Sequence, residues 1–266
     1  MASANPSLTA SVPSQTRCVV VVPCYNEAAR FDTEAFAGFL QSERAGRIGL
    51  LFVNDGSRDG TLAMLEAFRR RFPDRVSVLD QQPNRGKAEA VRYGMLEVIT
   101  SGTAAYTGYW DADLATPLDQ IVDFLDLLER HTGLNLIFGA RVRLLGRAIH
   151  RQAVRHYLGR CFATVASILL RMPVYDTQCG AKLFRITPEL PAVLDEPFHS
   201  RWIFDVEILA RLLAQHHYDV VLLEKEMYEY PLPVWTDVAG SKVKPTDFLR
   251  AFGELASIYR RHLAQR

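Results

Sequence analysis

The sequence lacks the features that would tie the chain to a membrane span, an oxidising compartment or a polyanion. No apolar run approaches the roughly 20 residues that a membrane-spanning helix needs. The 31 basic and 30 acidic residues nearly cancel, so the net charge of +1 indicates no particular partner. Four cysteines occur without metal-type spacing, and Cys18 and Cys24 sit in or beside an apolar run. We therefore expect reduced thiols in a cytoplasmic protein.

Two glycine-rich phosphate fingerprints are also missing. The chain has no G-x-G-x-x-G and no G-x-x-x-x-G-K, which argues against a dehydrogenase and a P-loop kinase. Residues 1–16 lack the basic start and long apolar core of a signal peptide, so we expect a disordered tail there. Because 48% of all residues are hydrophobic, residues 17–266 can bury the core of one large domain.

Short apolar runs alternate with helical patterns along the chain. The expected strands cover residues 18–23, 48–54, 76–79 and 104–109, and the expected helices cover residues 32–45, 59–72, 87–99 and a stretch from about Pro117. Strands that alternate with helices of about 10–15 residues predict an α/β fold, with a mostly parallel sheet flanked by helices. In such a sheet, ligands bind beyond the carboxyl ends of the strands.

The strongest chemical signal is Asp111-Ala112-Asp113, directly after an expected strand. Two carboxylates at i and i+2 suit a hard divalent ion that also binds water and a substrate diphosphate. An Asp-rich turn before a helix is the alternative. We expect Thr116 to cap that helix and Pro117 to take its first position, but this capping leaves both aspartates unexplained.

Three other expected strands also end in polar residues. These ends are Pro23-Cys24-Tyr25-Asn26-Glu27, Asn54-Asp55-Gly56-Ser57-Arg58-Asp59 and Asn84-Arg85-Gly86-Lys87. Each alone is typical turn chemistry. Together at one edge of a parallel sheet, they predict a cleft lined by hydrogen-bond acceptors, one lysine and a metal site.

The motifs resemble those of a known family. Pro-x-Tyr-Asn-Glu, Asn-Asp-Gly-Ser-x-Asp-Gly-Thr, Asn-x-Gly-Lys and Asp-Ala-Asp, in this order, resemble the GT-A nucleotide-sugar glycosyltransferases of family 2. Stretches 176–184, 201–207 and 233–242 resemble the dolichyl-phosphate β-glucosyltransferases and their bacterial relatives. Ala115 departs from the Gln that polyprenyl-phosphate mannose synthases usually have, which favours the glucosyl branch. Ala88 departs from the usual Gly-Lys-Gly.

The resemblance implies an inverting transfer of a hexose from a nucleotide sugar, with Mg²⁺ or Mn²⁺ as cofactor. UDP-glucose is the expected donor, with GDP-mannose as the second choice. The implied donor-binding residues are Pro23, Tyr25, Glu27, Asp55, Lys87, Asp111 and Lys242. Asp55 would accept a hydrogen bond from the base, and Asp113 with Asp111 would hold the metal that stabilises the leaving diphosphate. For Lys87 the alternative is an exposed lysine at a helix start.

An arginine-rich window marks the expected acceptor side. Residues 141–171 contain seven arginines and no acid. Apolar residues recur there at helical spacing (Val154, Leu158, Phe162, Val165 and Leu169), and arginines repeat every four residues (Arg147, Arg151 and Arg155). This pattern predicts a basic amphipathic helix on a membrane surface. A solvated arginine face over a packed stripe is the alternative. Nucleic-acid binding is not expected, because no aromatic residues interleave with the arginines.

The expected acceptor is a polyprenyl or dolichyl phosphate at the inner, cytoplasmic face of a membrane. A phosphate monoester is already anionic near neutral pH, so it needs placement but no general base. The implied acceptor-binding residues are Arg141, Arg155, Gln178, Arg201 and Trp202.

A soluble or hydroxyl acceptor stays open, and it would need a base. Asp205 is the catalytic candidate for that role and Glu207 the next, although acids also favour a helix N-terminus. A third possibility, a haloacid-dehalogenase-type phosphatase, also begins with Asp-x-Asp. That class wants its nucleophilic aspartate on the first strand and usually a threonine where this chain has Ala115.

Overall fold

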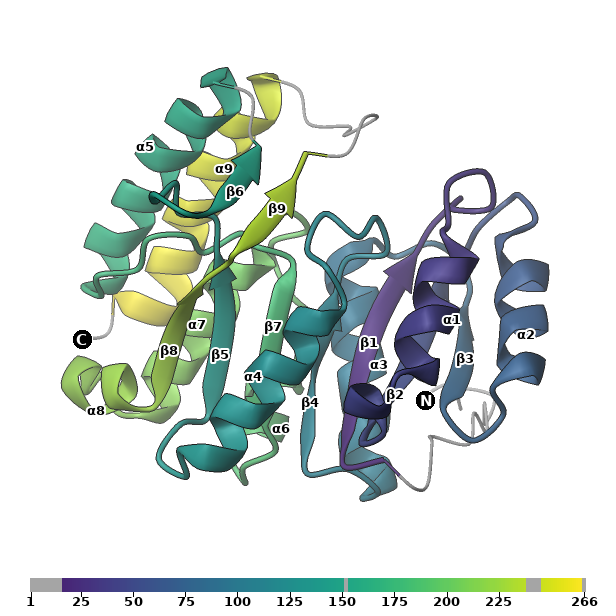
Figure 1. Ribbon diagram of the computed structural model, residues 1–266. Coiled ribbons are helices and arrows are strands. Elements are labelled where there is room, and N and C mark those ends of the chain that lie inside the picture. The colour runs from purple at the N-terminus through teal and green to yellow at the C-terminus, as the bar shows by residue number, and fades with distance from the viewer. Residues whose placement is uncertain (1–15, 151–152, 238–244, 265–266) are drawn as a thin grey trace, which may run out of the picture.

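Seven strands form the central sheet of this computed structural model, which describes residues 16–150, 153–237 and 245–264. The strand order is β3–β2–β1–β4–β7–β5–β8 (Figure 1). The strands are β1 Cys18–Cys24, β2 Ile48–Asp55, β3 Val76–Gln81, β4 Tyr106–Trp110, β5 Leu136–Ala140, β7 Ala181–Arg185 and β8 Met227–Pro231. Neighbours pair in parallel except at β7, which runs antiparallel to β4 and β5. The predicted mostly parallel α/β sheet is confirmed.

Helices cover both faces of the sheet, in two hydrophobic clusters. One face carries α1 Thr33–Gln41, α2 Thr61–Arg71 and α4 Asp119–Arg130. The other carries α3 Lys87–Ser101, α5 Ala153–Leu170, α6 Leu190–Leu194, α7 Phe204–Gln215, α8 Val220–Lys225 and α9 Pro245–Ile258. Figure 1 shows α1, α2 and α4 in front of the sheet and α6 and α7 behind it. A small parallel pair, β6 Ala148–His150 and β9 Val234–Thr236, lies beside the main sheet.

The central strand β1 explains why its sequence is continuously apolar. Val19 and Val21 pack into one hydrophobic cluster, while Val20 and Val22 pack into the other. A parallel strand covered by helices on both faces buries every side chain, so β-branched residues suit all its positions. From β1 the chain builds outward to β2 and β3, then returns to β4 on the other side of β1. That reversal is the switch point beside which α/β sheets bind ligands.

The predicted N-cap of the helix after the paired aspartates is wrong. The helix after the paired aspartates begins at Asp119 with Leu118 as N-cap and no side-chain cap, so Thr116 does not cap it. Instead, the indole N–H of Trp110 donates to the Thr116 carbonyl at 2.9 Å. This hydrogen bond holds the turn after β4, and no side chain caps the first turn of α4.

The arginine-rich window is not one basic helix. Arg147 lies ahead of strand β6, and α5 starts only at Ala153, so the four-residue arginine spacing does not follow a single helix face. The buried face of α5 carries Phe162 and Ala166, whereas Val165 of the predicted stripe is 36% exposed. Arg151 lies outside the described residues, as do residues 1–15 of the predicted tail; Thr16 is buried. No described helix is both long and apolar enough to span a bilayer.

The loop before α7, which carries Arg201 and Trp202, is held by a buried ion pair. Glu207 is fully buried and accepts a hydrogen bond from Arg211 at 2.7 Å. Its carboxylate also accepts the N–H groups of His199 and Ser200, each at 3.0 Å. Arg211 in turn donates to the carbonyls of Val193, Glu196 and Pro197. The pair therefore connects α7 to the loop ahead of it.

A histidine from the C-terminal π-helix Tyr259–Leu263 completes this contact. His262 Nε2 lies 3.5 Å from Glu207 Oε1. Together with His199 the two side chains lie close enough to surround a metal ion. Glu207, however, already uses both oxygens for Arg211 and two backbone N–H groups, so we interpret the cluster as a clamp. Burial alone would raise the pKa of Glu207, but His262, the Ser200 N–H and the Arg211 charge outweigh it and hold the pKa at about 2.

We predict that Glu207→Gln lowers the free energy of unfolding by about 3 kcal/mol at neutral pH, because it leaves Arg211 buried without a counter-charge. The folded-state pKa lies below the usual 4.5, so this stabilisation is complete above pH 4.5 and is lost as the pH falls toward about 2. Denaturant unfolding of both proteins across that range measures the gap. The exposed Glu224→Gln serves as control and should change stability by less than about 0.5 kcal/mol. An equal loss in both variants would contradict the clamp.

Candidate active site

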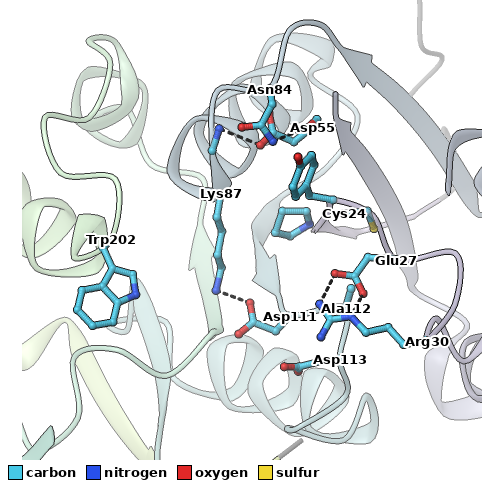
Figure 2. A pocket seen from close by; sticks show the side chains of 13 residues that line it. Cys24, Glu27, Arg30, Asp55, Asn84, Lys87, Asp111, Ala112, Asp113 and Trp202 are labelled. Carbon is cyan, nitrogen blue, oxygen red and sulfur yellow. Dashed lines mark hydrogen bonds and ion pairs between the residues drawn. The ribbon is translucent and has the colours of Figure 1, made fainter. Parts of the chain in front are cut away.

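A cavity of about 470 Å³ opens at the switch point, where the ends of β1, β2, β3 and β4 meet. Its lining residues are Pro23, Cys24, Tyr25, Glu27, Arg30, Asp55, Asn84, Gly86, Lys87, Asp111, Ala112, Asp113 and Trp202. Figure 2 shows Trp202 across the cavity from Glu27 and Arg30, with the two aspartates below Lys87. All the described residues predicted to bind the donor line this one cavity. Lys242 lies outside the described residues.

The loops after β1 and β2 are tied to each other by the motif residues of the second loop. Ser57 Oγ accepts the Asn26 N–H at 3.0 Å, and Thr61 Oγ1 accepts the Glu27 N–H at 2.8 Å. Asp59 Oδ1 accepts the Thr61 hydroxyl at 2.5 Å. The serine, aspartate and threonine of Asn-Asp-Gly-Ser-x-Asp-Gly-Thr therefore hold the turn that carries Glu27.

Asp55 organises the loop after β3. Its Oδ1 accepts the Arg85 N–H at 2.7 Å and its Oδ2 accepts the Gly86 N–H at 2.8 Å, while the Asn84 side chain donates to the Asp55 carbonyl. Gly56 lies so close that a Cβ there would meet the Asn84 nitrogen at 2.4 Å. Both Asp55 oxygens are thus engaged by protein N–H groups, which gives this carboxylate a structural task in addition to its place on the cavity wall.

Asp111 and Asp113 project from the turn after β4. The Asp111 N–H donates to the Gly180 carbonyl at 3.0 Å, and a Cβ on Gly180 would meet Asp111 Oδ2 at 2.0 Å. Gly180, at the entry to β7, thus leaves the space that the Asp111 carboxylate occupies. Asp113 Oδ1 accepts the Ala115 N–H at 3.1 Å. Burial, and then the charge of Asp111, raise the pKa of Asp113.

Two cations face these acids across the cavity. Lys87 Nζ forms an ion pair with Asp111 Oδ1, and Arg30 forms a bidentate ion pair with Glu27. Burial would lower the pKa of Lys87, but the charges of Asp111 and Asp205 outweigh it and raise that pKa. The hydrogen bond with Glu27 is the largest contribution that raises the pKa of Arg30. Each cation therefore stays charged beside its acid.

The donor set at this turn fits a divalent metal ion. Asp111 and Asp113 offer hard carboxylate oxygens from one turn into one cavity, which is the chemistry that Mg²⁺ and Mn²⁺ prefer. Burial, and after it the charge of Asp111, raise the pKa of Asp113. A cation bound beside the two carboxylates would offset the repulsion between their charges.

The predicted acceptor residues do not form one group. Arg141 is paired with Asp176 through two bonds, Nε–Oδ2 at 2.6 Å and Nη2–Oδ1 at 2.8 Å, and its guanidinium lies 5.3 Å from the Trp235 ring centroid. The backbone N–H of Gln178 donates to the same Asp176 at 3.2 Å. Trp202 lines the cavity at the switch point. Arg201 is exposed, and the side chain of Arg155 is not among those the structure describes.

Asp205, the candidate general base, lies in a buried cluster. Its Oδ1 accepts hydrogen bonds from Lys182 Nζ at 2.5 Å and from the Tyr109 hydroxyl. Lys182, only 1% exposed, also donates to the carbonyls of Thr177 and Cys179. Burial, and then the Asp205 charge, raise the pKa of Tyr109 well above its usual value, so its hydroxyl stays protonated. Both donors therefore bind the same carboxylate oxygen of a residue that is only 5% exposed.

Sequence reasoning missed two contributors to the site. Arg30 follows Glu27 by three residues, and that opposite-charge spacing is a signal for an ion pair. Lys182 sits inside an apolar strand, where a lone lysine must find a buried partner; the sequence does not say which acid that is.

Comparisons with known proteins agree with the predicted family and fold. A model of glycosyl transferase family 2 matches residues 19–187. The chain is 30% identical over 264 residues to a dolichyl-phosphate beta-glucosyltransferase of Trichomonas vaginalis, covering 95% of this chain and 74% of the relative. It is 32% identical over 258 residues to a dolichyl-phosphate beta-glucosyltransferase of Drosophila melanogaster, covering 92% of this chain and 74% of the relative.

Solved structures share the fold at low sequence identity. Glucosyl-3-phosphoglycerate synthase from Mycobacterium tuberculosis, in complex with Mn²⁺, uridine diphosphate and phosphoglyceric acid, matches with a TM-score of 0.64 and 19% identity, covering 94% of this chain and 79% of its own. The mannosyltransferase PcManGT from Pyrobaculum calidifontis, in complex with GDP-Man and Mn²⁺, matches with a TM-score of 0.58 and 17% identity, covering 94% of this chain and 65% of its own.

The fold is that of the GT-A class. The family match spans more than half of the chain and agrees with relatives along nearly its whole length. The chain belongs to glycosyl transferase family 2, as its motifs predict. The dehydrogenase, kinase and phosphatase alternatives are thereby set aside.

We predict that Gly180→Ala lowers glycosyl transfer by about 100-fold, because the new methyl group displaces the Asp111 carboxylate by the order of 1 Å. Turnover of the nucleotide sugar, measured on protein shown to be folded by circular dichroism, tests this. Gly133→Ala is the matched control, since a Cβ there meets nothing within 4 Å. Wild-type turnover of a folded Gly180→Ala protein would mean that the position of Asp111 does not matter.

Proposed function

We propose that this glycosyltransferase moves glucose from UDP-glucose to a polyprenyl or dolichyl phosphate, with inversion, using Mg²⁺ or Mn²⁺. The observation that carries the proposal is the cavity in which Asp111 and Asp113 face Lys87, in a chain whose relatives include several dolichyl-phosphate beta-glucosyltransferases. Structural neighbours bound to Mn²⁺ together with UDP or GDP-Man support a metal-dependent nucleotide-sugar site.

The cavity walls suggest how the donor lies. The nucleoside fits between Pro23 and Tyr25 on one side and the turn at Asn84 on the other. The diphosphate then lies near Asp111 and Asp113, and the sugar points toward Trp202 across the cavity (Figure 2). In this pose Asp55 supports the wall by holding the loop after β3.

Asp111 and Asp113 would hold the metal, and Lys87 would add a positive charge beside the diphosphate. A bound Mg²⁺ or Mn²⁺ supplies Lewis-acid stabilisation of the charge on the leaving nucleoside diphosphate. Among the described cavity-lining residues, Glu27 is paired with Arg30 and Asp55 holds a backbone turn. No further carboxylate is left there to form a glycosyl-enzyme intermediate, which supports a single inverting displacement.

The environment of Asp205 favours a phosphate acceptor over a hydroxyl acceptor. A general base must be able to take a proton from the acceptor, but Asp205 is 5% exposed and bonded to both Lys182 and Tyr109. Glu207 is fully buried in its clamp with Arg211. A phosphate monoester is already anionic and needs only orientation. The alternative with a soluble or hydroxyl acceptor therefore has the weaker support.

Orientation of the acceptor phosphate would come from the Trp202 side of the cavity. Arg141 lies at the end of β5, at the same edge of the sheet as Asp111, because β4 and β5 both run antiparallel to β7. Gln178 lies in the turn before β7. Asp176 already accepts two hydrogen bonds from the Arg141 guanidinium, so Arg141 would act on the phosphate mainly as a nearby positive charge. Arg155 and Arg201 remain proposed contributors on this side, and Lys242 remains one on the donor side.

An apolar tip flanked by arginines suits the membrane surface on which such an acceptor resides. Leu145 is fully exposed and Leu144 is 51% exposed, with the exposed Arg143 and Arg147 on either side. Leucines that enter the headgroup region beside arginines that attract anionic lipids make a peripheral contact. We propose this tip, in place of a basic helix, as the membrane contact. The four unpaired cysteines favour the cytoplasmic side.

A product assay tests the reaction. UDP-glucose and GDP-mannose are each offered with a short-chain polyprenyl phosphate or with soluble sugars, and the β-glucosyl polyprenyl phosphate should dominate. Asp113→Asn should lower its formation by about 100-fold or more through loss of an anionic ligand. Asp119→Asn, an exposed charge in the same segment, is the control. Transfer only to hydroxyl acceptors, abolished by Asp205→Asn, would favour the alternative.

A liposome assay tests the membrane contact. Replacing both Leu144 and Leu145 by serine should weaken binding to anionic vesicles by about a hundredfold, since each leucine contributes on the order of 1.5 kcal/mol when buried and about 1.4 kcal/mol is a factor of ten. Turnover with the short-chain, detergent-soluble acceptor should stay unchanged. The matched control replaces Val221 and Leu222, an exposed apolar pair on α8. Equal vesicle binding by both double variants would locate the contact elsewhere.

A further inference from the structure

The Lys87–Asp111 ion pair occupies the approach to a proposed metal ligand. The Asp111 carboxylate is confined on one side by Gly180, where even a methyl group would meet Oδ2 at 2.0 Å. Its other oxygen, Oδ1, contacts the Lys87 ammonium. A cation that binds Asp111 from the cavity must therefore compete with Lys87 for the same carboxylate.

Lys87 is built to move while its backbone stays in place. It is the first residue of α3, and the preceding Gly86 N–H is held by Asp55 at 2.8 Å. The Lys87 side chain itself is 42% exposed, and its ammonium has three donors on a flexible stem. Of the two described cations that line the cavity, Arg30 is held in a bidentate pair with Glu27, so Lys87 is the one that can exchange partners.

We propose that Lys87 couples metal binding to nucleotide binding by exchanging Asp111 for the diphosphate. This inference rests on the proposed function, because it takes Asp111 as a metal ligand and a nucleoside diphosphate as the leaving part of the donor. The diphosphate draws the ammonium away and frees Asp111, and the metal then binds a site with one cation fewer. Such coupling is reciprocal: whatever factor the nucleotide adds to metal affinity, the metal adds to nucleotide affinity.

The exchange predicts opposite effects of one substitution on two ligands. Without nucleotide, Lys87→Met should bind Mn²⁺ roughly ten- to a hundredfold more tightly than the wild type, because Asp111 is already free. UDP binding in the presence of Mn²⁺ should weaken, because the diphosphate loses its partner. The factor by which UDP tightens Mn²⁺ binding should fall by a similar amount. If Lys87 contacted only the diphosphate and did not compete for Asp111, Lys87→Met would bind Mn²⁺ without nucleotide as tightly as the wild type does.

The experiment titrates Mn²⁺ into the purified full chain, with and without UDP, and follows free Mn²⁺ by electron paramagnetic resonance. Arg85→Met is the charge-matched control: it removes one positive charge two residues away, from an exposed side chain that does not line the cavity. Lys87→Arg keeps the charge and should stay within about threefold of the wild type in nucleotide-free Mn²⁺ affinity.

The outcomes separate the exchange from the proposed function. Tighter nucleotide-free Mn²⁺ binding in Lys87→Met but not in Arg85→Met supports the exchange. Equal Mn²⁺ affinity of Lys87→Met and wild type, or equal tightening in both methionine variants, overturns it while metal and nucleotide binding stand. If the wild-type chain binds no Mn²⁺ even with UDP, both the exchange and the proposed function are overturned. Asp113→Asn, which lacks a proposed metal ligand, is the reference for the absence of Mn²⁺ binding.

Discussion

The buried ammonium of Lys182 is the contact on which the geometry of the site depends. It is 1% exposed and uses its three donors on the carbonyls of Thr177 and Cys179 and on the carboxylate of Asp205. A charge so far from water is tolerated only when its hydrogen bonds and counter-charge are complete. Because all three contacts must form together, the turn before β7 and the start of α7 have one relative position. That turn includes Gly180, against which Asp111 packs.

Much of the fold was predictable because its signals are contiguous. Strand β1 contains four consecutive valines, and alternate valines of that run pack into the two hydrophobic clusters on opposite faces of the sheet. The paired aspartates follow β4 directly, and parallel strands bring such ends to one edge of a sheet. The predicted helix start at Thr116 is wrong. Local helix propensity does not reveal that the Trp110 indole, six residues earlier, donates a hydrogen bond to the Thr116 carbonyl.

The site was less predictable where it depends on partners distant in sequence. The arginine-rich window contains no acid, yet Arg141 finds Asp176 beyond it, and Arg160 stacks on the Tyr175 ring with its guanidinium 3.6 Å from the centroid. Spacing within the window could not reveal either contact. Asp205 likewise looked like an accessible base at a helix start, and its neighbour Lys182 is 23 residues away in the chain. Tertiary pairing decides which charged groups are available to a ligand.

The reversed direction of β7 has a consequence for how this enzyme can diversify. Since β7 runs against β4 and β5, the segment that enters β7 and the segments that leave its neighbours meet at the same edge. Apart from Trp202, the described residues that line the cavity come from the chain up to Asp113, and the residues proposed to orient the acceptor come from later segments. Within the connection between β5 and β7, the turn at residues 177–180 positions Asp111, whereas no described residue from 142 to 175 lines the cavity. On the proposed function, that stretch can therefore change in length and alter the acceptor side while the residues that line the cavity stay the same.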